Sequence, residues 1–239
     1  TVFKGRKGSE GEVGQRCLRE GMPEFPRWTA AMDDDLQGAL DKLLSQADGP
    51  LGGLSFSFTI ADPSLEDCPL VGCSSGFREL CGYDTHEIVG RNCRFMLDPV
   101  PVELIDVEVR HKVREYCKCV REGVTYGRER SDHSEWITPG RHEDDAMFFV
   151  QVNARKDGTL FKNMFYLKDV VLDEKAYIVG LQAELPGKEV GIANEDPQLI
   201  ESCKQACRCL DKNMAEVERL MGKYCWVTSS MRRQEDEED

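Results

Sequence analysis

The stretch Gly90-Arg91-Asn92-Cys93-Arg94-Phe95-Met96 decides the fold of this chain. It places a cysteine between an amide and a guanidinium, after an apolar segment that ends at Gly82-Tyr83. A thiol beside fixed positive charge and a hydrogen-bonding amide is typical of a cysteine that reacts or faces a ligand. Cys93 is therefore the first candidate for a functional residue.

Period-two patterns on both sides of this stretch predict β-strands. Residues 54–60 alternate apolar and hydroxyl side chains, and residues 70–73 form a second short strand. Three further strand-like runs follow at residues 147–154, 159–171 and 176–184. Asp157-Gly158, between the first two of these runs, is a hairpin signal. The last three strands are therefore expected to form an antiparallel meander.

Helical patterns precede, interrupt and follow these strands. A leucine stripe within residues 28–47 predicts a first helix, which Asp48-Gly49-Pro50 ends. Further helices are predicted at residues 76–81, 85–89, 102–122 and 196–226. Because strands and helices do not alternate regularly, the pattern indicates an α+β fold rather than a parallel α/β fold.

The helix predicted at residues 196–226 carries a heptad-like apolar seam. Its members step by four and three residues: Cys203, Cys207, Leu210, Met214, Val217, Met221 and Tyr224. Two interpretations are open. One is an amphipathic helix packed on its own domain or on a larger partner, and the other is a helix that pairs with another helix.

The composition restricts the partners and the compartment of the chain. A net charge of −13 over 239 residues disfavours nucleic acid and anionic lipid as partners. No apolar run reaches the ~20 residues that a membrane span needs. The 11 cysteines are odd in number and irregularly spaced, so we expect free thiols in a reducing intracellular compartment, the cytoplasm. They lack paired C-x-x-C hooks and a nearby His pair, so no metal site is expected.

The chain divides into three parts. Segments outside the strand and helix patterns are a polar aperiodic arm, a hydrophilic inserted loop and an acidic tail, at residues 1–26, 127–146 and 232–239. We therefore expect an N-terminal arm and amphipathic helix at 1–53, a central domain at 54–185 that contains the inserted loop, and a C-terminal long helix with its tail at 186–239.

Four blocks of the central domain resemble, in the same order, the pattern of the light-oxygen-voltage (LOV) family, a branch of the PAS fold. The blocks are Phe77-Arg78-Glu79-Leu80-Cys81-Gly82-Tyr83, Gly90 to Met96, Asn153 with Asn163, and Gly180-Leu181-Gln182. The resemblance implies a PAS-like antiparallel five-stranded sheet with short helices on one face, flanked by the N- and C-terminal helices. This chain departs from the pattern at Leu97, where the family usually has Gln, and in a longer separation between Cys93 and Asn153.

The resemblance also implies an FMN cofactor whose ring is read by amides. By position, Asn153 and Asn163 would meet the pyrimidine edge of the ring, and Asn92 would help to hold the same edge. An amide suits this role because it carries both a donor and an acceptor. Phe165 belongs to the same implied set of cofactor contacts.

Arginines are implied as ligands of the cofactor phosphate, by charge-assisted hydrogen bonds. Arg94 is the first. Ungapped counting makes Arg110 the second, and a short insertion would make it Arg114. The two are four residues apart and can share a helical face, so both stay candidates, with a slight preference for Arg110.

The activity that the resemblance implies is blue-light sensing. Cys93 would bond reversibly to the photoexcited flavin, and the adjacent ring nitrogen would gain a proton. Gln182 would then face a donor instead of an acceptor and reorient, which makes it the signal switch. We expect the signal to leave through the flanking helices, above all 196–226, to a protein partner or a second copy of the chain.

Two other functions are open at this stage. A flavin-free PAS module could serve as an interaction or scaffold subunit of a larger assembly, because a fold does not fix a function. Redox sensing by the many thiols would need exposed thiols of low pKa. We do not expect an enzyme, since the sequence presents no nucleophile–base pair, phosphate loop or metal motif.

Overall fold

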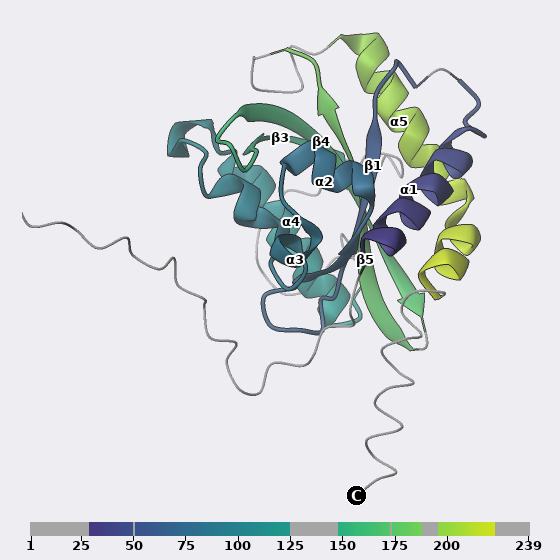
Figure 1. Ribbon diagram of the computed structural model, residues 1–239. Coiled ribbons are helices and arrows are strands. Elements are labelled where there is room, and N and C mark those ends of the chain that lie inside the picture. The colour runs from purple at the N-terminus through teal and green to yellow at the C-terminus, as the bar shows by residue number, and fades with distance from the viewer. Residues whose placement is uncertain (1–28, 50, 125–147, 173, 188–195, 223–239) are drawn as a thin grey trace, which may run out of the picture.

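The centre of the computed structural model is a five-stranded antiparallel sheet in the order β2-β1-β5-β4-β3 (Figure 1). The structure describes residues 29–49, 51–124, 148–172, 174–187 and 196–222. The strands are β1 Phe56–Ala61, β2 Leu70–Cys73, β3 Phe148–Ala154, β4 Leu160–Leu172 and β5 Lys175–Leu185. The α+β class and the five-stranded antiparallel sheet that the sequence predicted are confirmed.

Five labelled helices, two short 3₁₀ turns and a further helical segment at residues 214–222 surround the sheet in the described part of the chain. The helices are α1 Ala30–Leu44, α2 Ser75–Cys81, α3 Thr85–Ile88, α4 Val107–Arg121 and α5 Pro197–Lys212, and the turns are η1 Cys93–Leu97 and η2 Val102–Leu104. The predicted helix at 102–122 is thus divided, because the Asp106 carboxylate accepts from the backbone N–H groups of Glu108 and Val109 and starts α4 there.

The sheet is covered on both sides, which explains the burial of β1. Every residue of β1 is buried, although the alternation at 54–60 is typical of a half-exposed strand. The hydroxyl residues Ser57 and Thr59 register with Gln182 and Gly180 of β5. This face lies under α2, α3, α4 and η1 and contains the candidate site, so the polar positions line a cavity instead of meeting solvent (Figure 1).

Helix α1 is fixed to the domain by polar contacts as well as by its leucine stripe. Leu36, Leu40, Leu43 and Leu44 are all buried. Asp33 is fully buried; its carboxylate lies 2.8 Å from Nε of Arg78 in α2 and accepts a short hydrogen bond from the Thr85 hydroxyl in α3. These contacts hold α1 against α2, while its other side meets α5.

Helix α5 ends at Lys212, earlier than the predicted helix, with Asn213 as its C-cap, and a separate helical segment covers residues 214–222. The predicted seam does not face outward: Cys203, Cys207, Leu210, Val217 and Met221 are all buried within this single chain. Contacts to α1 and β4 account for this, including Cys209 Sγ to the Leu43 carbonyl at 3.3 Å and the Tyr166 hydroxyl to Asp211 at 2.8 Å. The seam therefore packs on its own domain.

Several predicted segments lie outside the described residues. They are the arm at 1–26, the inserted loop at 127–146, the acidic tail at 232–239 and the seam residue Tyr224. Across the described helices, none combines the length and apolarity that crossing a bilayer requires.

Candidate functional site

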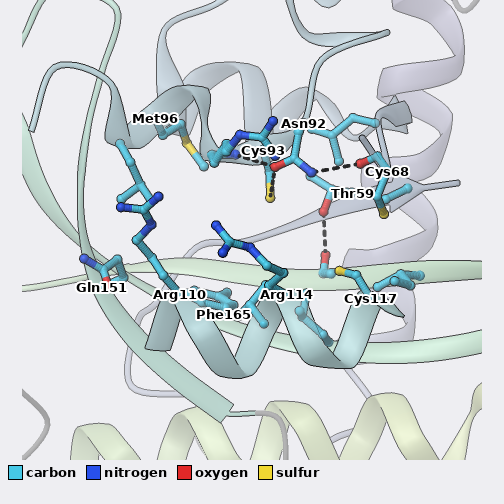
Figure 2. Close-up of a pocket in the computed structure, with 18 of the residues that line it drawn as sticks. Thr59, Cys68, Asn92, Cys93, Met96, Arg110, Arg114, Cys117, Gln151 and Phe165 are labelled. Carbon is cyan, nitrogen blue, oxygen red and sulfur yellow. Dashed lines mark hydrogen bonds between the residues drawn. The ribbon is translucent and has the colours of Figure 1, made fainter. Parts of the chain in front are cut away.

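A cavity of about 480 Å³ lies between the sheet and the layer formed by η1 and α4 (Figure 2). This volume falls within the range of small-molecule sites. All nine residues predicted to hold the cofactor line it: Asn92, Cys93, Arg94, Arg110, Arg114, Asn153, Asn163, Phe165 and Gln182. The structure thus brings together side chains that are up to ninety positions apart in the sequence.

Cys93 is the first residue of η1, and its loop is held in place by Asn92. The Asn92 amide donates to the carbonyls of Asp67 and Cys68 at 2.7 and 3.1 Å. Its oxygen accepts from the Arg94 backbone N–H at 3.0 Å and lies 4.0 Å from the Cys93 sulfur. Both ends of the Asn92 side chain are therefore bonded within the protein, which gives this residue a positioning role beyond the ring contact expected from the resemblance.

The Cys93 thiol faces the cavity in its protonated form. Figure 2 shows its sulfur pointing into the space toward which Arg110 and Arg114 extend from α4. Burial raises the pKa of Cys93 to about 12, with a further contribution from Cys117, and Arg94 offsets these effects only in part. The positive charge beside Cys93 does not make it a thiolate, contrary to the simplest interpretation of the sequence, because desolvation outweighs the charge.

The amides on the sheet form a continuous band across three strands. Asn163 on β4 donates to the Gln182 oxygen on β5 at 2.9 Å. Gln182 donates in turn to the Thr59 hydroxyl on β1 at 3.1 Å. On the other side of Asn163, β3 contributes Gln151, its register partner, and Asn153, two residues further along. Each of these amides is at least 96% buried, so each must find its hydrogen bonds inside the protein or with a ligand.

Three atoms of this band are buried and have no hydrogen-bond partner among the described residues: Asn163 Oδ1, Gln151 Nε2 and Gln151 Oε1. Leaving a buried amide unpaired costs about 1–3 kcal/mol per group. A ligand in the adjacent cavity with both donors and acceptors along one edge would pair with these atoms. The pyrimidine edge of a flavin has this character, so the residues present fit that group.

The remaining walls match the other parts of a flavin. Apolar and aromatic side chains provide surfaces for a planar ring: Met96, Leu97, Val109, Val113, Phe165, Leu167 and Ile178. Leu97 continues this apolar surface where the family pattern has an amide.

Gly180 keeps the space above β5 open. A Cβ at this position would meet the Thr59 hydroxyl oxygen at 2.5 Å, which is closer than carbon and oxygen approach without a bond. Glycine is therefore required by the close approach of β1 and β5 at the floor of the cavity.

Three arginines that the resemblance implies as phosphate ligands, Arg94, Arg110 and Arg114, line the cavity. Arg94 forms a short ion pair with Asp67, in which both side chains are about half exposed. Arg110 and Arg114 both line the cavity from α4, so the structure keeps both candidates for the second phosphate ligand. A phosphate would meet several guanidinium groups here, which favours charge-assisted binding.

Sequence reasoning missed some lining residues. Thr59 and Gln151 supply polar groups, and Cys68 and Cys117 are two further thiols that hydrogen-bond each other. Gln151 could have been found, because it lies two residues before Asn153 and so shares its strand face. Thr59 meets Gln182 only through the pairing of β1 with β5, which no local signal predicts.

Comparisons with known proteins support the same assignment. The white collar 1 protein of Neurospora crassa is 33% identical over 134 residues, which are 55% of this chain and 10% of that protein. Blue-light-activated histidine kinase 2 of Erythrobacter litoralis is 30% identical over 190 residues, or 76% of this chain and 41% of that protein. The chain thus spans less than half the length of either curated relative. No family model matches the chain.

A solved structure of a fungal LOV domain photoreceptor is 30% identical to this chain, with a TM-score of 0.40. The match covers 65% of this chain and 94% of that one. The identity extends over nearly the whole of that LOV domain. The same region of this chain contains the cysteine loop, the amide band and the antiparallel sheet described above. The chain therefore belongs to the LOV family of PAS-fold domains.

Proposed function

We propose that this chain is a blue-light sensory domain that binds FMN and forms a reversible bond between the flavin and Cys93. One observation carries the proposal: a single cavity combines the Cys93 thiol, a band of buried amides with unpaired atoms, and two arginines on α4. A bound flavin would supply a light-excitable ring with a carbon able to bond to sulfur and a nitrogen able to take up a proton.

The residues of the chain hold and orient that group. Asn153 and Asn163 meet its polar edge, and Phe165 and Leu167 contact its apolar body. The arginines bind the phosphate, which favours FMN over riboflavin. Cys93 keeps its proton until light is absorbed, because its pKa lies near 12 and neutral solution cannot remove the proton.

Gln182 is well placed to act as the switch, and its neighbours determine what reorientation costs. It now accepts from Asn163 and donates to Thr59. If the Gln182 amide turns over, Thr59 still bonds it, because a hydroxyl both donates and accepts. Asn163 would then direct its N–H at another N–H, so it must turn as well. We propose that the two amides reorient together, because leaving one of them mispaired would cost about 1–3 kcal/mol.

The signal has a short path to α1. The Ser57 hydroxyl donates to the backbone carbonyl of Gln182 at 3.4 Å. One residue earlier on β1, the Phe56 carbonyl accepts from the Gln37 amide of α1 at 3.0 Å, and the same amide accepts from Gly76 of α2. We propose that reorientation of Gln182 shifts β1 against α1. A partner protein or a second copy then detects the change at the flanking helices.

Absorption spectroscopy tests the proposal. Purified protein should contain flavin that chromatography after denaturation identifies as FMN, and blue light should bleach its blue absorption band, with recovery in the dark. Cys93→Ala should retain flavin but lose the bleaching. Cys119→Ala is a matched control, because this thiol lies on α4 without lining the cavity, and it should bleach as the wild type does.

Two outcomes would contradict the proposal. Reversible bleaching that persists in Cys93→Ala would remove the thiol from the photochemistry. A protein that stays colourless after incubation with FMN would favour the flavin-free interaction module instead. The cavity and its unpaired amide atoms argue against that module, since a ligand-free domain gains nothing from them.

A further inference from the structure

Gln151 is a buried amide for which the implied set of cofactor contacts has no role. It lies in the middle of β3, and only 4% of its surface is exposed. Its register partner across the sheet is Asn163, and both side chains line the cavity. In the view of Figure 2 it lies at the end of the pocket away from Cys117.

Neither end of this side chain is bonded. Among the described residues, Gln151 is the one amide whose Nε2 and Oε1 are both buried without a hydrogen-bond partner. Other amides of the fold bond fully within the protein: Gln37 pairs with Phe56 and Gly76, and Asn92 with the loop at Asp67. A buried glutamine without hydrogen bonds destabilises the folded state unless a group in the cavity pairs with it.

The required partner must both accept and donate. An N–H of Gln151 needs an acceptor, and its oxygen needs a donor. Asn163 Oδ1, the third unpaired atom, lies on the adjacent strand and also needs a donor. A carbonyl next to a ring N–H offers an acceptor to Gln151 Nε2 and a donor to one of the two unpaired oxygens along one edge. The apolar walls on Phe165 and Leu167 provide no such groups.

We propose that Gln151 is a third amide, with Asn153 and Asn163, that reads the polar edge of the flavin ring. This inference rests on the proposed function. Gln151 is a specificity-determining residue: it selects a ring with adjacent carbonyl and N–H groups and fixes its rotation in the plane of the cavity. A sugar-alcohol chain could supply similar hydroxyls, so the experiment separates the ring from the chain.

The test compares Gln151→Leu with Gln37→Leu, the same substitution at a bonded amide of α1 outside the cavity. Binding of FMN and of lumiflavin, the bare ring without chain or phosphate, is measured by fluorescence titration. Gln151→Leu should weaken both ligands about tenfold, the loss expected from roughly 1.4 kcal/mol. The infrared carbonyl bands of bound FMN should move to higher frequency, because a carbonyl that accepts fewer hydrogen bonds is stiffer.

The melting temperature of flavin-free protein provides an independent readout. Gln151→Leu should leave it unchanged or raise it, because an unpaired amide is replaced by an apolar side chain of similar size. Gln37→Leu should lower it, because bonded partners lose their glutamine, while ligand affinity and carbonyl bands stay as in the wild type.

The outcomes distinguish this inference from the proposed function. If wild-type protein binds and bleaches flavin but Gln151→Leu binds both ligands normally with unshifted carbonyl bands, the role of Gln151 is refuted and the proposed function stands. If only FMN is weakened and lumiflavin is not, Gln151 contacts the chain and the ring-edge assignment is wrong. If the wild type binds no flavin, the proposed function fails first.

Discussion

At the scale of single residues, the site is shaped by competition between protein and ligand for the same polar groups. Asn92 bonds the cysteine loop, and Gln182 bonds Asn163 and Thr59. Gln151 and one atom of Asn163 remain for a ligand. Arg94 is available to a ligand only in part, because it lines the cavity but is paired with Asp67. Affinity for the phosphate therefore depends on how readily Arg94 leaves this carboxylate.

Asp67→Asn should tighten FMN binding. The substitution removes a carboxylate that competes for Arg94 and repels the phosphate, and an exposed pair of this kind is worth at most about 1 kcal/mol. We therefore expect about a two- to fivefold gain in affinity. Asparagine suits the position because Asp67 has a φ of 70°. Fluorescence titration with riboflavin is the control: without a phosphate its affinity should not change, and an equal gain for both ligands would contradict the explanation.

At the scale of elements, α1 and α5 form one flanking layer, but they are held differently. The contacts of α1 to α2 and α3 centre on the buried carboxylate of Asp33. Contacts of α5 are largely apolar, with the Tyr166 hydroxyl and Lys168 on β4 meeting Asp211. A change in β1 should thus reach α1 first, because Gln37 bonds directly to that strand.

Asp33→Ala should destabilise the domain by about 3 kcal/mol, because removal of one partner of a buried ion pair leaves the other charge uncompensated. Urea denaturation followed by circular dichroism measures this loss. Asp34→Ala is the matched control: Asp34 is 70% exposed and lies 3.6 Å from the same arginine, so its loss should cost less than about 0.5 kcal/mol. Equal effects of the two substitutions would show that burial of Asp33 does not matter.

At the scale of the whole molecule, the fold keeps several of its buried thiols neutral. Burial raises the pKa of Cys73, Cys81, Cys93 and Cys207, and neighbouring charged groups contribute less. Such thiols are poor redox sensors, which argues against that alternative. Cys117 differs, since its hydrogen bond with Cys68 lowers its pKa. The cost of this burial should appear as a dependence of stability on alkaline pH.

Stability should fall as pH rises above about 9. Burial raises the pKa of Cys81 to about 11 from 9.0, so the folded state holds a proton that the unfolded state has already lost. The stabilising contribution is complete below pH 9 and is lost as pH rises through 11, with about 1 kcal/mol lost at pH 10. Melting temperatures from pH 8 to 11 measure the slope. In Cys81→Ala the slope should be shallower, and an unchanged slope would exclude this thiol as a cause.

Local patterns were sufficient for the strands, and the resemblance to the LOV pattern supplied the list of candidate residues. The strands begin and end within about two residues of their predicted bounds, because apolar periodicity reflects the faces they bury. The end of α5 at Lys212 was not predicted, because the apolar seam continues past the break at Asn213 and periodicity alone does not reveal it. Whether the seam pairs within the chain or between chains depends on α1 and β4, which are distant in sequence.

The sequence by itself determined which chemical groups are available. They are a cysteine flanked by asparagine and arginine in one loop, and asparagines and a glutamine at fixed positions on adjacent strands. Only the tertiary structure decided which of these groups are free to meet a ligand. Bonding within the protein occupies Asn92 and Gln182, and burial keeps Cys93 protonated. Strand pairing leaves the Gln151 amide without a hydrogen-bond partner among the described residues. The physical reason is that hydrogen bonds and desolvation depend on neighbours across the sheet, which strand register brings together and local sequence does not encode.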